Sequence, residues 1–203
     1  MTRLFIATTN PGKLREIRGI LGRLPVEILT LRDLAPVPEP EETGATFAEN
    51  ARVKALYYDG CLTTGGADRP DTVAEDSGLV IDALDGEPGV RSARFLRPGT
   101  SYLKRFDEIY RRLAEVPTRA RSARFVCALA VVHNGTVIYE TTGTVEGEIA
   151  DAPRGEGGFG YDPIFYYRPY GRTLAEVTEA DKLRVAHRGE AFRRLAGWLE
   201  QRL

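Results

Sequence analysis

The chain has 203 residues, 42% of them hydrophobic, which is enough to bury the core of one large domain or of two closely joined lobes. The 28 basic and 29 acidic residues almost cancel, and this balance excludes a general electrostatic attraction to nucleic acid or to anionic lipid. Any recognition of phosphate must therefore be local.

The N-terminal segment and the cysteines narrow the class further. The sequence turns polar by Thr8, too early for the apolar region of a secretory signal, and the longest apolar run, FVCALAVV, is too short to span a bilayer. Cys61 and Cys127 lack CxxC spacing and a Cys/His cluster, which argues against a disulfide framework or a structural zinc site. We therefore expect a cytoplasmic protein.

The N-terminal part of the chain predicts a strand, two helices and a loop between them. The strand RLFIAT gives way to a polar turn and then to an amphipathic helix with Lys13 in its first turn. The apolar positions of that helix recur at three- and four-residue steps: Leu14, Ile17, Leu21 and Leu24. The segment APVPEPEETG (35–44) is predicted to be a loop inside a domain, and the capping box TFAE (46–49) opens a second helix that runs to about Tyr58.

The remaining segments mix strands with two further helices. Helical spacing marks a third helix, at Leu103, Phe106, Tyr110 and Leu113, and GEAFRRLAGWLEQRL marks a terminal one. Strand patterns occur at VEILTL, TVAE, LVIDAL and ARFVCALAVVH, and Asn134-Gly135 joins the last of these to TVIYETT in the strongest hairpin signal. At least one strand pair is then antiparallel. We predict an α/β (mixed α+β) fold, with a long, curved mixed sheet and flanking helices in one domain over 1–203.

The segment TTNPGK (8–13) is the first candidate binding site. It lies at a strand-loop-helix junction, where unpaired backbone N–H groups and the positive end of the helix dipole favour an anion. Its hydroxyls, amide and cation are groups that a polyphosphate needs. It is not a P-loop, because Ala7 stands where the first Gly should be and Leu14 replaces the Ser or Thr. A polar turn with a solvated lysine is the alternative.

The segment AEDSGL (74–79) is a candidate metal site. Glu75 and Asp76 are predicted to end a short strand, with Ser77-Gly78 turning away, and adjacent carboxylates repel each other unless a cation lies between them. Magnesium prefers such hard oxygen ligands and often joins one or two carboxylates to substrate phosphates. The upstream sequence EPEET (39–43) offers Glu41 and Glu42 as further ligands. An acidic surface turn, which DSG favours by itself, is the alternative.

Two later segments suggest a nucleoside pocket. GEGGFGYDPIF (155–165) combines glycines, which let a backbone approach a ligand, with aromatic rings on which a base can stack. Packing of the same rings into the core is the alternative. DKLRVAHRGE (181–190) gathers Lys182, His187 and Arg188 ahead of the terminal helix, whereas His133 lies beside the hairpin turn and is expected to be structural.

Six segments in this order resemble the inosine triphosphate pyrophosphatase family, the XTP/dITP diphosphatases that remove deaminated purine nucleotides. They are TTNPGK, EETGATFAENA, AEDSGL, PGVRSARF, GFGYDPIF and AHRGEA, and they span nearly the whole chain. The resemblance implies a magnesium-dependent, homodimeric enzyme with a two-lobed α/β fold around a central cleft. It also implies hydrolysis of ITP, dITP and XTP between the α and β phosphorus, giving a nucleoside monophosphate and pyrophosphate.

The resemblance assigns roles to individual residues as well. It makes Asp76 the catalytic acid/base, assisted by Lys13, and makes Asp76, Glu41 and Glu75 the metal ligands. Between Glu41 and Glu42 we favour Glu41. It places substrate contacts at Thr8, Thr9, Asn10, Pro11, Gly12, Lys13, Ser77, Phe159, Gly160, Tyr161, Asp162, Lys182, His187 and Arg188.

Charge and hydrogen bonding give the expected mechanism. Magnesium and Lys13 neutralise triphosphate oxygens, after which a carboxylate orients and deprotonates the attacking water. Inosine and xanthine carry a 6-keto acceptor where adenine has a 6-amino donor, so donors from His187 and Arg188 would favour the deaminated bases. Two positions depart from the commonest family pattern: Glu75 stands where many members have Asp, and Ala186 replaces a Ser, so it cannot supply a hydroxyl.

Two other functions fit parts of the same pattern. A Maf-type pyrophosphatase would act on pyrimidine or modified nucleotides, and a substrate panel separates it from the first reading. A nucleotide-sensing module would bind without turnover. The carboxylates at 75–76 argue against the sensor, because they hinder triphosphate binding unless a metal is recruited.

Overall fold

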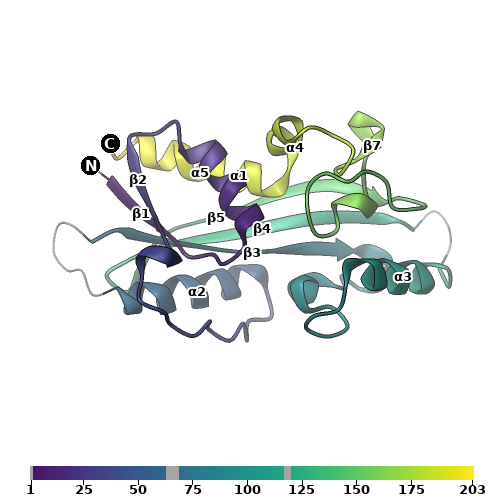
Figure 1. Ribbon diagram of the computed structural model, residues 1–203, viewed down its shortest axis with the longest axis horizontal. Helices are drawn as coiled ribbons and strands as arrows, with labels where there is room; N and C mark the ends of the chain where they lie inside the picture. The colour runs from purple at the N-terminus through teal and green to yellow at the C-terminus, as the bar shows by residue number, and fades with distance from the viewer. Residues whose placement is uncertain (1, 63–68, 117–119) are drawn as a thin grey trace. The chain divides into compact units, whose positions relative to one another are not determined.

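The computed structural model describes residues 2–62, 69–116 and 120–203. Within that part of the chain, a seven-stranded sheet has the order β2-β1-β3-β4-β5-β6-β7 (Figure 1). The strands are β1 (Thr2–Ile6), β2 (Val26–Thr30), β3 (Asp71–Ile81), β4 (Ser122–His133), β5 (Thr136–Ile149), β6 (Phe165–Tyr167) and β7 (Arg172–Thr173). The α-helices are α1 (Pro11–Leu21), α2 (Phe47–Cys61), α3 (Tyr102–Leu113), α4 (Glu179–Val185) and α5 (His187–Glu200). The predicted mixed α/β class is confirmed.

The sheet combines parallel and antiparallel pairs. β1 pairs in parallel with both β2 and β3, whereas β6 pairs in antiparallel fashion with β5 and β7. Asn134 and Gly135 have φ values of 49° and 73°, as the two central residues of a type I′ hairpin turn require. The predicted hairpin between β4 and β5 is therefore confirmed.

The chain divides into two compact units. Unit 1 comprises Met1–Asp76, Cys127–Gly143 and Arg188–Leu203, and unit 2 comprises Ser77–Val126 and Thr144–His187. The three longest strands, β3, β4 and β5, contribute residues to both units.

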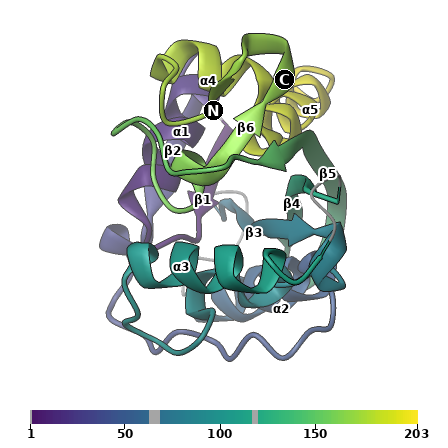
Figure 2. The same cartoon turned by 90° about the vertical axis from the view of Figure 1, so that its right-hand side faces the viewer.

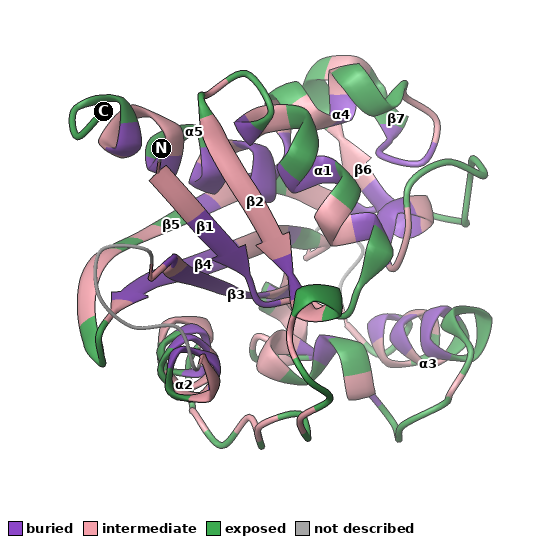
Figure 3. Ribbon diagram, turned by 60° about the vertical axis from the view of Figure 1, so that its left-hand side comes forward, coloured by how far each residue is buried: buried purple, intermediate pink, exposed green. Residues whose placement is uncertain are grey.

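Unit 1 has α1 and α5 on one face of its strands and α2 on the other (Figures 1 and 3). Because side chains alternate along a strand, Leu4 and Ile6 of β1 pack with the helices α1 and α5, whereas Phe5 packs with α2. We call these two clusters the α1/α5 core and the α2 core. The α1/α5 core includes Ile17, Leu21, Val73, Cys127, Leu129, Val131, Phe192 and Leu195, and the α2 core includes Ala51, Ala55, Tyr58, Ala74, Ala128, Ala130 and Val132.

Unit 2 has one apolar cluster, formed largely by α3 and the parts of β3, β4, β5 and β6 that belong to this unit. Figure 2 brings α3 and β6 to the front. Its buried members include Leu79, Ile81, Phe95, Phe106, Ile109, Leu113, Phe125, Ile149, Tyr161, Ile164 and Phe165.

Local capping signals explain where the helices of unit 1 begin. Asn10 caps α1, since its Oδ1 accepts hydrogen bonds from the N–H groups of Gly12 and Lys13 at 2.9 and 3.2 Å. The predicted capping box of Thr46 and Glu49 is present at the start of α2. Within the described part of the chain, no helix is long and apolar enough to cross a membrane.

Two helical predictions need revision near the C-terminus. The short α4 was not predicted, because its seven residues carry too few apolar positions to set a period. The terminal helix begins at His187 rather than at Gly189, so His187 and Arg188 lie in its first turn and not ahead of it.

The prediction that a strand ends at Glu75 and turns at Ser77-Gly78 was wrong. β3 continues to Ile81, and Gly78 serves close packing instead of a turn. A Cβ at Gly78 would lie 2.3 Å from Ser92 Oγ, which accepts a hydrogen bond from the N–H of Leu79 at 2.9 Å. The turn-like DSG sequence therefore lies within a continuous strand.

Candidate active site

The turn at 8–13 is a capped helix start with a tethered lysine. The N–H groups of Gly12 and Lys13 donate to the Asn10 side chain, and the N–H of Asn10 donates to Thr8 Oγ1 at 3.2 Å. The Thr9, Asn10 and Pro11 side chains are exposed. In this arrangement the N–H groups of Gly12 and Lys13 are both held by Asn10.

Lys13 belongs to a buried charge cluster on the α1/α5 side of β3. Its Nζ lies 2.7 Å from Glu75 Oε1. Arg188, from α5, lies 2.6 Å from Glu16 and 3.5 Å from Glu75, and only 1% of Arg188 is exposed. Cys127 Sγ lies 3.3 Å from Glu75 Oε2.

The charge balance of this cluster keeps Glu75 ionised. Burial alone would raise the pKa of the Glu75 carboxyl, but the nearby charges of Arg188, Lys13 and Lys54 hold that pKa well below its usual range. Burial and the negative charge of Glu75 raise the pKa of the Cys127 thiol well above its usual value. The thiol therefore stays protonated and donates to Glu75.

Asp76 lies on the other side of β3, against α2. Its Oδ1 is 3.1 Å from Lys54 Nζ, and its Oδ2 accepts from Asn50 Nδ2 at 3.1 Å. Lys54 also donates to Glu42 Oε1 at 2.7 Å. One ammonium therefore bridges two carboxylates, Asp76 and Glu42, that come from a strand and from the loop before α2.

The environment of Asp76 differs from that of Glu75. Burial raises the pKa of the Asp76 carboxyl above its ordinary value, the Lys54 charge lowers it, and the Glu42 charge raises it further. The net shift is upward. A raised carboxylate pKa in a site with a specific charge partner is a feature of candidate general bases.

Glu75 and Asp76, whose adjacency in the sequence predicts a joint metal site, have different partners in the structure. Neighbouring residues of a continuous strand point to opposite faces, so Glu75 meets Lys13 and Arg188 while Asp76 meets Lys54. Among the residues that the structure describes, no three His, Cys, Asp or Glu side chains are grouped as a metal site. The carboxylate that shares Lys54 with Asp76 is Glu42, whereas Glu41 is exposed; the predicted role of Glu41 stays a prediction.

In unit 2, the glycine-rich loop forms a small polar cluster around Asp162. Asp162 Oδ2 accepts from the N–H of Phe159 at 2.7 Å and from Lys182 Nζ at 2.6 Å. Lys182 Nζ also lies 4.5 Å from the centre of the Phe159 ring. Gly158 has a φ of 69°, and a Cβ there would lie 2.2 Å from Asp162 Oδ2, so only glycine fits.

The aromatic residues of this loop have different environments. Tyr161 is buried in the core of unit 2, and its hydroxyl donates to the carbonyl of Ser92 at 2.9 Å. Phe159 is only partly buried, and its ring lies against the Lys182 ammonium. His187 stacks on Phe125 at 4.8 Å between ring centres. The core-packing alternative therefore holds for Tyr161, and stacking of a base on Phe159 stays a prediction.

Three residues that contribute to these clusters were not predicted from the sequence: Asn50, Lys54 and Glu16. Asn50 and Lys54 lie four residues apart on α2, in the segment ENARVK, which reads as a solvated helix face. Glu16 lies between apolar positions of α1 and pairs with Arg188, 172 residues away. Asn50 and Lys54 are four residues apart, which places both side chains on one helix face. This spacing was the one signal in the sequence that could have indicated their shared role.

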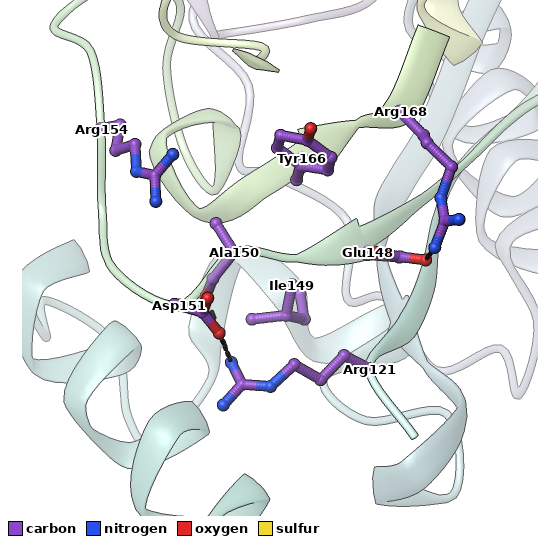
Figure 4. Close-up of a pocket in the computed structure, with 8 residues that line it drawn as sticks. All are labelled: Arg121, Glu148, Ile149, Ala150, Asp151, Arg154, Tyr166 and Arg168. Atoms are coloured by element: carbon purple, nitrogen blue, oxygen red, sulfur yellow. Dashed lines mark hydrogen bonds and ion pairs between the residues drawn. The ribbon is translucent and has the colours of Figure 1, made fainter. Parts of the chain in front are cut away.

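A pocket of about 590 Å³ in unit 2 is lined by other residues (Figure 4). Two of its three arginines are neutralised, because Arg121 lies 3.5 Å from Asp151 and Arg168 pairs with Glu148. Its lining consists of Arg121, Glu148, Ile149, Ala150, Asp151, Arg154, Tyr166 and Arg168. No predicted site residue is among them.

Comparison with known proteins gives consistent matches over nearly the whole chain. The model of the Ham1 family matches residues 4–198. A dITP/XTP pyrophosphatase of Geobacter sulfurreducens is 45% identical over 201 residues, covering 98% of this chain and 98% of that protein. Another, of Geobacillus kaustophilus, is 44% identical over 195 residues, covering 96% and 93%.

Solved structures agree with the sequence matches. A HAM1 protein from Coxiella burnetii has a TM-score of 0.88 at 35% identity and covers 99% of this chain and 100% of that chain. The Staphylococcus aureus Ham1 protein has a TM-score of 0.86 at 34% identity, with 100% of both chains covered.

Proposed function

The chain belongs to the Ham1 family, and we propose from that premise that it hydrolyses the deaminated purine nucleotides ITP, dITP and XTP to a nucleoside monophosphate and pyrophosphate. It is an enzyme, a nucleoside triphosphate pyrophosphatase, and the resemblance found in the sequence is confirmed. The observation that carries the chemical assignment is the buried Asp76 carboxylate, held between Asn50 and Lys54 with Glu42 beside it.

The triphosphate is proposed to bind at the turn 8–13. Thr8 and Thr9 supply hydroxyls, and Asn10, Pro11 and Gly12 shape the turn. Lys13 supplies the cation. Since Lys13 is paired with Glu75 in the structure, a phosphate oxygen would share its ammonium with that carboxylate. Ser77, next to Asp76 in the chain, is proposed to contact the same substrate.

Glu42 and Asp76 are the residues proposed to hold Mg²⁺. Two carboxylates already brought together by one ammonium suit a small hard cation that takes its other oxygen ligands from water and from substrate phosphates. When bound, Mg²⁺ supplies neutralisation of phosphate charge during attack. Glu75, on the opposite face of β3, is proposed instead to set the charge around Lys13.

Asp76 is proposed to accept a proton from the attacking water. Lys54 keeps one oxygen of this carboxylate oriented and Asn50 keeps the other, so the group is held in place to take that proton. Lys13 stabilises charge that shifts toward the leaving pyrophosphate.

The base and sugar are proposed to lie against the 158–162 loop. Phe159 offers a ring for stacking, the Gly160 backbone allows close approach, and Lys182 offers a donor held by Asp162. His187 remains a proposed donor to the 6-keto oxygen. Donation by Arg188 to the same 6-keto oxygen stays a prediction. Arg188 also has a structural role, because it is buried and pairs with Glu16 and Glu75.

Gly158→Ala is expected to raise the KM for dITP about tenfold or more, with a smaller change in kcat, because the added Cβ displaces Asp162 from Phe159 and Lys182. The control is Gly171→Ala, since Gly171 has a φ of 62° and its Cβ would meet no atom closer than 3.8 Å. Steady-state kinetics compare the two variants. Equal KM values in both would mean that the Asp162 cluster does not hold the base.

The oligomeric state and the cellular compartment are also proposed from membership of the Ham1 family. We propose a homodimer in the cytoplasm that acts on small-molecule nucleotides, with no nucleic acid or membrane partner. Sedimentation equilibrium of the purified chain checks the dimer.

Product analysis tests the proposed reaction. Purified protein is incubated with ITP, dITP, XTP and the common triphosphates, with Mg²⁺ or with EDTA, and the products are separated by ion exchange. The expected products are inosine, deoxyinosine or xanthosine monophosphate, according to the substrate, and pyrophosphate, in the Mg²⁺ samples only. Release of orthophosphate, or no product at all, would contradict the proposal; turnover confined to pyrimidine or modified nucleotides would favour a Maf-type enzyme, and binding without turnover a sensor.

A further inference from the structure

The loop that carries Glu42 is fastened to the first turn of α2 through three successive backbone N–H groups. The N–H of Gly44 donates to Asn50 Oδ1 at 2.8 Å. The N–H groups of Ala45 and Thr46 donate to Glu49 Oε2 at 2.7 and 3.1 Å. The loop therefore has a fixed path two residues after Glu42.

Asn50 connects this loop to Asp76. Its side chain is fully buried, with Oδ1 accepting from Gly44 and Nδ2 donating to Asp76 Oδ2 at 3.1 Å. A carboxamide performs both functions because it has an acceptor at one end and donors at the other. A carboxylate has no donor for Asp76, and an apolar side chain has neither group.

The contact between Asn50 and Gly44 leaves no space for a larger residue. A Cβ at Gly44 would lie 2.7 Å from Asn50 Oδ1 and 2.9 Å from the N–H nitrogen of Asn50. Glycine at this position thus lets the loop approach the helix closely enough for the hydrogen bond to form.

The two oxygens of Asp76 have separate partners. Oδ2 is held by Asn50 and Oδ1 by Lys54, which also holds Glu42. Lys54 is a long, flexible chain, whereas Asn50 is short and enclosed. The geometry therefore makes Asn50 the more rigid of the two supports.

We propose that Asn50 is a positioning residue that fixes the Asp76 carboxylate and the loop of Glu42 relative to each other. The two proposed metal ligands, Asp76 and Glu42, are then held in place before a metal binds. This inference rests on the proposed function for its catalytic consequence, but its structural content does not. Buried partners that orient metal ligands typically contribute about 10- to 100-fold in metal affinity or activity.

The test uses Asn50→Leu, which keeps the approximate volume and removes both hydrogen bonds. Mn²⁺ binding to the nucleotide-free protein is followed by electron paramagnetic resonance, and kcat and KM for dITP are measured by pyrophosphate release. We expect the Mn²⁺ Kd to rise about tenfold or more and kcat to fall by a similar factor. At saturating Mg²⁺ the KM for dITP should change less than about threefold, because Asn50 is not among the proposed nucleotide contacts.

Glu49→Gln is the matched control. It lies in the same helical turn and keeps an acceptor for Ala45 and Thr46, yet it does not contact Asp76. Its Mn²⁺ Kd and kcat should stay within about twofold of the unaltered protein. Gly44→Ala is the second test, since its Cβ would lie 2.7 Å from Asn50 Oδ1 and would displace the loop from that side chain, and its Mn²⁺ Kd should rise about threefold or more.

Circular dichroism shows which variants are folded, and only a folded variant is used to judge the proposal. If Asn50→Leu does not fold, Gly44→Ala alone decides. A folded Asn50→Leu, or failing that Gly44→Ala, with unaltered Mn²⁺ Kd would overturn the inference. Failure of the proposed function would appear differently, as absent pyrophosphate release in the unaltered protein, while the Mn²⁺ measurement would still report on Asn50.

Discussion

Asp76→Asn is expected to lower kcat for dITP about a thousandfold or more while the protein stays folded. The substitution keeps the shape of the side chain but removes the proposed proton acceptor and one ligand charge, and general-base and electrostatic contributions of this kind combine to at least that size. Pyrophosphate release at saturating Mg²⁺ measures the loss. The far-ultraviolet circular dichroism spectrum should not change.

Asp71→Asn is the matched control for that experiment. Asp71 lies at the start of the same strand and pairs with His133 at 2.7 Å, so the same chemical change is made away from Lys54 and Asn50. Its kcat should stay within about twofold of the unaltered enzyme. Retention of a tenth of the activity by Asp76→Asn would show that Asp76 is not the catalytic carboxylate.

Arg188→Met is expected to destabilise the protein by about 3–5 kcal/mol, because it leaves the buried carboxylates of Glu16 and Glu75 without their shared cation. Urea unfolding at neutral pH measures the change. Arg194→Met, on the same helix, removes an exposed cation paired with Glu190 and should cost about 1 kcal/mol or less. Equal losses in the two variants would contradict the buried role of Arg188.

The pH dependence of the free energy of unfolding provides a second test of the role of Arg188. In the unaltered protein the pKa of Glu75 is held below its unfolded value, so its contribution to stability is present above about pH 4 and is lost only as the pH falls through the lower folded pKa. Removing Arg188 takes away the largest of the charges that lower this pKa, so the folded pKa of Glu75 rises toward its unfolded value. The stability difference between the two proteins should therefore narrow as the pH falls through that higher folded pKa, because the carboxylate that Arg188 stabilises is then protonated in the variant and, at still lower pH, in the unaltered protein.

Local sequence signals predicted the elements that depend on local interactions. The Asn134-Gly135 turn, the capping box of Thr46 and Glu49 and the helix start before Lys13 each need only a few neighbouring residues, and each was found as expected. Mixed strand orientation followed from the hairpin, and the fold class followed from that.

The site was harder to predict because strand continuity decides which residues meet. The sequence DSG looks like a turn, so Glu75 and Asp76 were expected to converge on one metal. Gly78 instead packs against Ser92, β3 continues, and the two carboxylates face opposite sides. The partners of these carboxylates come from distant segments, as with Glu16 and Arg188, and no local pattern reports such pairings.

The most direct test of the proposed function is the ratio of kcat/KM for dITP to that for dATP, measured by pyrophosphate release under saturating Mg²⁺. A pocket that offers donors to a 6-keto oxygen should reject a 6-amino group by about a hundredfold or more, because the buried donors would face another donor unpaired. We predict a ratio of at least about one hundred for the unaltered enzyme. Equal values of kcat/KM for the two nucleotides would contradict the assignment of this chain to deaminated purine nucleotides.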